Sequence, residues 1–299
     1  MFRTTLLLLA VSLLAPTAGG EEPEKKIRLW VRGDDFGYSH ASNIAMEKAF
    51  SEGIMQSASV LVPGPWFKET ATIVRKHPEW SVGVHLTITS EWNTLRWRPV
   101  SPISEVPSLV APDGYLWGFG YGRPKPQDRL SDNSPWAEHA PNLEEVEAEF
   151  RAQIEKAKSM EVRLDYIDCH MGLACREDIL PITKKLAKEY CLAISSDNMF
   201  DLGRVRITWD RRTPEEAKQV LSAELRKLTP GTWLYVAHPA ADTSELRAVD
   251  TNDGEQWAKQ RSSVLSAWTD PEIRRLIDEL GIELIDPRIL FDYQACEPK

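Results

Sequence analysis

The chain has 299 residues, of which 42% are hydrophobic and 27% charged, and its formal net charge is −9 at pH 7. This apolar fraction excludes a disordered or fibrous protein, and the length allows one large α/β domain or two smaller ones. Because 45 acidic side chains outnumber 36 basic ones, the chain has no general attraction to nucleic acid or anionic lipid, and we expect no nucleic-acid partner.

Residues 1–20 have the pattern of a secretory signal peptide. Basic Arg3 precedes an apolar run that ends at Leu14, and Ala18 and Gly20 fit the small residues of a cleavage site. The run of about ten residues is half the roughly 20 that a spanning helix needs, so a membrane anchor is the less favoured alternative. We expect export to the periplasm or the extracellular space, with no stable membrane span after cleavage.

Four cysteines follow the signal segment without forming a CxxC pair: Cys169, Cys175, Cys191 and Cys296. Export permits disulfides, but a chain of this length does not need them for stability. We expect mainly buried structural thiols, with one disulfide among them as the alternative.

Eight short β-prone runs alternate with helical patterns, at residues 27–32, 57–62, 81–87, 164–169, 192–195, 205–209, 232–237 and 282–285. Helix starts are indicated by Asn142 with Glu145 three residues on, and by Pro directly after Thr213 and after Asp270. This βα alternation predicts a single α/β domain over residues 27–295, a (β/α) barrel that is distorted or incomplete. An open doubly wound sheet is the alternative.

One segment, at about residues 88–141, interrupts the alternation after the third strand. It is rich in Pro, Gly, Ser and Trp, and it is far longer than the roughly four to six residues of an ordinary connection. We expect this insertion to fold over the mouth of the domain.

Polar residues gather where the predicted strands end, at Asp34 and Asp35, at His85, at Asp168 and His170, and at His238. In parallel α/β folds this edge of the sheet is where sites are built. Two histidines and one carboxylate leave coordination positions open for water and substrate, which is typical of a catalytic metal site.

Each of these residues also has a structural alternative. Two adjacent Asp residues reach one site only where the strand opens, for which Phe36-Gly37 gives the opportunity; otherwise they form a solvated turn or a helix N-cap. His85, between apolar neighbours, could be a hydrogen-bonded core residue. Asp168 could ligate a metal together with His170 or orient its imidazole. His238 could be a general acid or a strand-end cap.

Taken together, these motifs resemble the YdjC-like carbohydrate deacetylases, the group of the chitooligosaccharide and hopanoid-associated deacetylases. The resemblance rests on Asp34-Asp35-Phe36-Gly37, Asn43, Gly53 with Ser57-Ala58-Ser59, Gly83-Val84-His85-Leu86, Asp168-Cys169-His170 and His238-Pro239. It implies a barrel-like fold and one divalent metal ion, magnesium or zinc, in an enzyme that hydrolyses N-acetyl groups of amino sugars or oligosaccharides.

Carried over position by position, the resemblance makes Asp35, His85 and His170 the metal ligands and Asp34 the catalytic base. His238 would be the catalytic acid, and Asp168 would support a ligand from behind. Gly172 departs from the family, whose members often carry a second histidine there. The insertion and the export signal also differ from the cytoplasmic disaccharide deacetylase, which leaves the sugar open.

Sugar binding would give the tryptophans of the insertion a role, because pyranose rings lie flat on aromatic faces. The candidates for such subsites are Trp92, Trp97, Trp117 and Trp136; the alternative is that they attach the insertion to the barrel. Two other functions stay open, a noncatalytic exported carbohydrate-binding protein and a metal-dependent ester or phosphoester hydrolase. The oligomeric state is also open, with a homodimer among the alternatives.

Overall fold

The computed structural model describes residues 26–90, 92, 94–118, 141–195, 202–207, 213–249 and 254–291. The predicted signal peptide, Trp136 and Cys296 lie outside these residues. Within them, no helix is long and apolar enough to cross a membrane.

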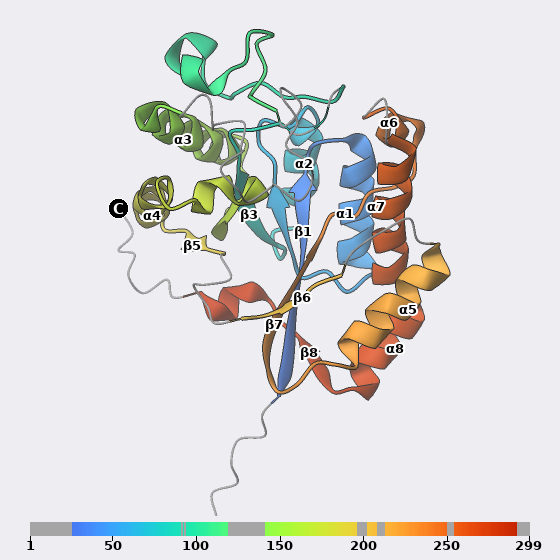
Figure 1. Ribbon diagram of the computed structural model, residues 1–299. Coiled ribbons are helices and arrows are strands. Elements are labelled where there is room, and N and C mark those ends of the chain that lie inside the picture. The colour runs from blue at the N-terminus through green and yellow to red at the C-terminus, as the bar shows by residue number, and fades with distance from the viewer. Residues whose placement is uncertain are drawn as a thin grey trace, which may run out of the picture.

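Strands and helices alternate along most of the described chain, except that β6 follows β5 in this order and three helices lie between β7 and β8 (Figure 1). The strands are β1 (Ile27–Phe36), β2 (Ser57–Val60), β3 (Ser81–Leu86), β4 (Tyr166–Cys169), β5 (Ala193–Ile194), β6 (Gly203–Val205), β7 (Gly231–Ala237) and β8 (Ile282–Leu284). The helices are α1 (His40–Ser51), α2 (Phe67–Val74), α3 (Leu143–Ser159), α4 (Leu180–Tyr190), α5 (Pro214–Leu225), α6 (Ser244–Arg247), α7 (Gly254–Trp268) and α8 (Pro271–Glu279). Short 3-10 helices are η1 (Ile103–Glu105), η2 (Pro107–Leu109), η4 (His170–Cys175) and η5 (Pro287–Leu290). Seven of the eight predicted strands are therefore confirmed, with small shifts at their ends. The strand predicted at 205–209 is displaced, because β6 ends at Val205, residues 206 and 207 are not in a strand, and residues 208 and 209 lie outside the described part of the chain.

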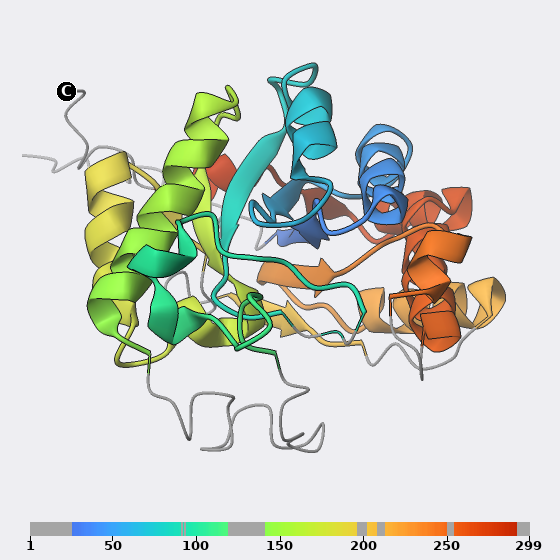
Figure 2. The same cartoon turned by 90° about the horizontal axis from the view of Figure 1, so that it is seen from above.

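All strand pairs of the sheet are parallel, in the order β5-β4-β3-β2-β1-β7-β6. β8 pairs with the first residues of β1, beside the part of β1 that pairs with β2. Among the described strands β5 and β6 are the two ends of this order, so the sheet is a curled, incomplete barrel. Seen from above, the helices lie in an arc around the outside of the strands (Figure 2). The predicted distorted or incomplete barrel is confirmed.

β1 is the central strand, and this explains its sequence. Leu29, Trp30 and Val31 are consecutive and completely buried, as expected for a parallel strand that is covered on both faces. Arg32 continues this run as a buried charge. Burying an arginine costs free energy unless the guanidinium is paired with an acidic group. The partners of Arg32 therefore mark a candidate functional site at this end of the sheet.

Helix α3 holds the described part of the insertion against the sheet. The buried carboxylate of Glu149 accepts hydrogen bonds from the backbone N–H groups of Val100 (3.0 Å) and Ser101 (2.9 Å). One turn later, Gln153 bonds to both backbone groups of Thr87, just after β3. Residues 94–118 lie over the end of the sheet toward which β1 points (Figure 1).

The helix starts follow the sequence signals. Thr213 and Glu216 form a capping box at α5, and Asp270 caps α8. Asn142 caps α3 by accepting from the N–H of Glu144, but Glu145 does not complete a capping box. The carboxylate of Glu145 instead accepts from the N–H of Ser108 in the insertion.

Among the described cysteines the structure has the alternative of one disulfide. Cys169 and Cys175 form a disulfide, whereas Cys191 is a free, half-buried thiol. The six-residue separation is short: Cys169 is the last residue of β4, and Cys175 is the last residue of η4, which follows directly.

Candidate metal centre

Adjacent Asp34 and Asp35 reach one site because β1 contains a bulge. Gly33 pairs with Ala58 and Phe36 with Val60, so two residues of β1 face the single Ser59 of β2. Asp35 takes the left-handed conformation, with φ 67°, which is uncommon outside glycine but tolerated by Asp. The sequence predicts that the strand opens after the two Asp residues, at Phe36-Gly37. In the structure the irregularity of the strand is at the Asp residues themselves, between Gly33 and Phe36.

Asp35, His85 and His170 converge from the ends of β1, β3 and β4. Asp35 Oδ1 lies 3.4 Å from Nε2 of His85 and 3.3 Å from Nδ1 of His170. All three side chains are buried, and their ligand atoms lie within 4.8 Å of one another. The structure thus brings together the three predicted metal ligands.

His85 is held from behind by Asp168, whose Oδ2 lies 2.7 Å from Nδ1 of the ring. The two residues are direct partners in the β3–β4 register. A carboxylate behind an imidazole fixes the ring and leaves its other nitrogen for a metal. Asp168 thus contacts an imidazole of the site, in agreement with the predicted orienting role. The imidazole that it contacts is that of His85, however, and not that of His170.

Arg32 connects the carboxylates of the site. Its Nε lies 2.7 Å from Oδ1 of Asp34 and its Nη2 lies 3.0 Å from Oδ2, a bidentate pair. The same Nη2 lies 3.0 Å from Oδ2 of Asp168, and Nη1 bonds to the hydroxyl of Ser195 after β5. Arg32 therefore fixes the orientation of Asp34, the proposed base.

His238 follows β7 and approaches the site from the other side. Its Nε2 lies 3.9 Å from Oδ2 of Asp35, and its side chain is 44% exposed, against 3% for Asp35. The guanidinium of Arg261 in α7 lies 3.3 Å from the same Asp35 oxygen. His238 is therefore the histidine of the site that an incoming substrate meets.

Charge pairing determines the pKa of the two buried carboxylates, Asp35 and Asp168, whereas desolvation determines that of the partly exposed His238. Burial alone would raise the pKa of Asp35, but His238, His170 and His85 hold it well below its usual range. Burial would likewise raise the pKa of Asp168, and Arg32 and His85 lower it instead. For His238, burial lowers the pKa, Asp35 opposes this, and Arg261 adds to it. Both carboxylates are ionised at neutral pH, which a metal site requires.

The residues present fit a divalent ion. Asp35 Oδ1 is buried, and no described group donates a hydrogen bond of normal geometry to it. A buried carboxylate oxygen is costly without a partner, and a cation between it and the two imidazoles would supply one. Two imidazoles and one carboxylate are a zinc-type donor set, while the oxygen-rich neighbourhood of Asp34 and Asp168 also suits magnesium.

Trp92 and Trp97 line the site from behind. Their exposed fractions are only 4% and 2%, and the Trp97 ring meets the His170 ring edge-on at 5.9 Å. Trp92 lies under the guanidinium of Arg261, 5.1 Å from its ring centroid. Neither indole presents an open face to a sugar, so the structure favours the packing alternative for these two. Trp117 is half-buried and remains a candidate; Trp136 lies outside the described residues.

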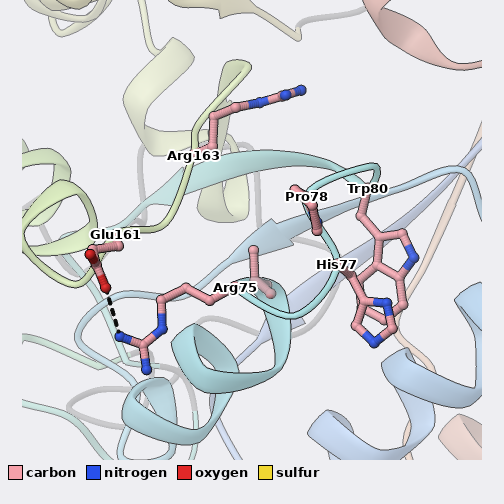
Figure 3. A pocket seen from close by; sticks show the side chains of 7 residues that line it. Arg75, His77, Pro78, Trp80, Glu161 and Arg163 are labelled. Carbon is pink, nitrogen blue, oxygen red and sulfur yellow. Dashed lines mark hydrogen bonds and ion pairs between the residues drawn. The ribbon is translucent and has the colours of Figure 1, made fainter.

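A separate surface pocket of about 330 Å³ lies at the amino-terminal end of the sheet, where β3 and β4 begin, opposite the strand ends that form the candidate metal site (Figure 3). Trp80 and His77 stack there with centroids 4.0 Å apart, beside the Arg75–Glu161 ion pair. Phe50 stacks on the same indole, also at 4.0 Å. Because two parallel rings at this distance occupy opposite faces, the Trp80 indole offers no face for a sugar.

Comparison with known proteins decides the family. The sequence profile described as YdjC-like protein matches residues 28–279, which is most of the chain. The chain belongs to the YdjC-like family. The resemblance inferred from the strand-end motifs is thereby confirmed.

Curated relatives of this YdjC-like chain carry the name carbohydrate deacetylase. The one from Brevibacillus brevis is 28% identical over 87% of this chain and 98% of its own length, and the one from Thermus thermophilus is 29% identical over 82% and 88%. A solved structure from Enterococcus faecalis, described as a cellobiose-phosphate cleavage protein, has a TM-score of 0.68 and 25% identity, covering 90% of this chain and 98% of that one.

Two arginines of the site were not singled out from the sequence. Arg32 had a signal, because it is a charge in an apolar strand two residues before Asp34, and residues i and i+2 share a face. No sequence signal pointed to Arg261, because it lies in α7, 226 residues after Asp35, and the two meet only in the folded protein.

Metal binding is expected to release a proton from His85. Burial would lower the pKa of His85, but Asp168 and Asp34 outweigh it and raise the pKa to about 10. Below that pH, Nε2 carries a proton that an ion must displace. We expect release of about one proton per ion near pH 7, and an affinity that rises about tenfold per pH unit over the neutral range.

Calorimetric titration of the metal-free protein in buffers of different ionisation enthalpy measures this proton. An ion that binds with no proton release, and with an affinity independent of pH, would contradict the displacement of a proton from His85.

Proposed function

We propose that this chain is an exported, metal-dependent carbohydrate deacetylase that releases acetate from N-acetylated amino sugars or oligosaccharides. The observation that carries the proposal is the convergence of Asp35, His85 and His170, with Asp34 directly beside them on the same bulge. The names of the curated relatives support the reaction class.

Asp35, His85 and His170 would hold the ion. A divalent ion at this place would polarise the acetyl carbonyl and lower the pKa of a water molecule, so that the water can lose a proton as it attacks the carbonyl carbon. Asp168 keeps Nδ1 of His85 engaged, so that Nε2 faces the ion.

Asp34 would take the proton of the attacking water. Both of its oxygens are bound by Arg32, which prevents the carboxylate from turning away, and each oxygen keeps a further lone pair. His238 would protonate the amine nitrogen as the C–N bond breaks, because an amine leaves poorly without a proton. The lowered pKa of His238 makes its protonated ring a stronger acid for this step.

Export is supported by two observations. The first twenty residues have the pattern of a signal peptide, and the Cys169–Cys175 disulfide is typical of an oxidising compartment. An exported enzyme would meet oligosaccharides outside the cytoplasm, for which the half-buried Trp117 in the insertion is a candidate contact.

The test is acetate release from a panel of N-acetylated amino sugars of increasing chain length, with and without chelator. Two further arms contain an O-acetylated sugar and a sugar phosphate. We expect chelator-sensitive acetate release from N-acetyl substrates. Release of phosphate alone would support the phosphoester alternative, and binding without any product would support the noncatalytic one.

A further inference from the structure

We propose that the Cys169–Cys175 disulfide is a positioning clamp for His170, which holds this imidazole at the metal site. The inference rests on the metal site proposed above. It assigns a role to two cysteines that the chemistry itself does not use.

The clamp begins at the residue next to the ligand. β4 ends at Cys169, which is fixed in the sheet by pairing with Leu86 of β3. His170 follows at once and is 2% exposed, with Nδ1 3.3 Å from Asp35. The bond to Cys175 therefore leaves from the backbone position directly before the ligand.

The chain makes an irregular turn directly after His170. Met171 and Gly172 both take left-handed conformations, with φ 52° and 75°. For Met171 this conformation is unfavourable, because its Cβ crowds the backbone. A Cβ added at Gly172 would meet nothing within 4 Å, so the tip of this loop is open to space. Met171 is half-buried against the core, and Leu173 and Ala174 are buried, so only the tip at Gly172 is exposed. The course of such an irregular turn depends on how its two ends are held.

The far end of the loop is anchored to α4. The carbonyl of Ala174 accepts a hydrogen bond from the buried hydroxyl of Thr183 at 2.6 Å, and the N–H of Arg176 bonds to Leu173. Cys175 lies between these two contacts. The disulfide, with Cα atoms 5.8 Å apart, thus joins the end of β4 to a segment fixed on α4, and His170 lies between the two.

A metal ligand has to be held within about 0.5 Å of its productive position to give full affinity. Without the disulfide, His170 would remain on a strand end whose following loop can adopt other conformations. Loss of such outer support typically weakens metal binding about 10–100-fold. Because the ligands themselves are intact, the site would still fill at high metal concentration.

The test compares the double variant Cys169→Ser/Cys175→Ser with wild type and with Cys191→Ser, the matched control at the free thiol. Both cysteines are replaced together, since a single thiol left beside His170 could itself bind metal. Wild type is first shown by peptide mapping to contain the 169–175 link. Metal dissociation constants come from chelator competition below the unfolding transitions, and the absorption spectrum of bound Co²⁺ reports ligand geometry.

We expect the double variant to bind metal about 10–100-fold more weakly, with an altered Co²⁺ spectrum and with kcat recovered at saturating metal. Cys191→Ser should match wild type. A lower melting temperature with an unchanged dissociation constant and spectrum would overturn the clamp and leave a purely structural staple. If the serine variant does not fold, Cys169→Ala/Cys175→Ala is measured in the same way. A wild type that binds no metal would instead contradict the proposed function.

Discussion

Asp34→Asn is expected to lower kcat for acetate release by about 10²–10⁴-fold, the usual contribution of a general base. The amide keeps the shape of the carboxylate and one oxygen for Arg32, but it cannot take a proton from water. Asp35 and the two histidines are untouched, so the metal dissociation constant should stay close to that of wild type. Steady-state kinetics and a metal titration of the same preparation measure both quantities.

The matched control for this variant is Asp278→Asn, which makes the same chemical change on an exposed position of α8. It should have wild-type kinetics. Activity of Asp34→Asn above about one per cent of wild type would show that Asp34 is not the base. Loss of metal together with activity would place Asp34 among the ligands. Its carboxylate also lies in a buried group with His85 and Asp168, whose ligand atoms are within 4.8 Å of one another.

His238→Gln is expected to lower kcat by a similar factor of about 10²–10⁴, but only for substrates with a poor leaving group. An amine needs a proton as it departs, whereas a nitrophenolate does not. The variant should therefore lose N-acetyl hydrolysis and keep most of its activity on an aryl acetate. Asp34→Asn should lose both, because both reactions need the activated water.

The control for the second variant is His77→Gln, since His77 lies at the opposite edge of the sheet beside Trp80 (Figure 3). It should leave both reactions unchanged. An equal loss of the two activities in His238→Gln would contradict an acid role and would indicate that His238 supports Asp35, 3.9 Å away.

The fold could be predicted from the sequence because its signals are local. Runs of β-branched and apolar residues separated by capped helices fix the number and direction of the strands, as the capping box of Thr213 and Glu216 illustrates. Closure of the barrel could not be predicted in the same way. Whether the barrel closes depends on which strands pair at the edges of the sheet. The order of strand pairing is set by contacts between distant segments and cannot be inferred from any one of them.

The ligand set could be predicted because each member stands at a strand end, and parallel strands end at one edge. The partners behind the ligands could not. Asp168 supports His85 through the β3–β4 register, which the spacing to His170 within β4 conceals. Arg261 comes from α7 and meets Asp35 only after folding.

The tryptophans show the limit of composition as a guide. Trp92 and Trp97 stand in the predicted insertion, but burial makes them part of the wall around His170 and Arg261. A count of aromatic residues does not distinguish a ring that packs from one that binds. Only the exposed fraction of each ring separates the two.

Metal reconstitution of the chelated protein, followed by acetate release from an N-acetylated sugar, tests whether the Asp35–His85–His170 site holds a catalytic ion. We predict that chelation abolishes activity and that a tightly bound divalent ion restores it up to a plateau at one ion per chain. Asp35→Ala should neither bind the ion at that level nor regain activity. Full activity of the chelated wild type, or restoration of Asp35→Ala to the wild-type rate, would contradict the proposed metal centre.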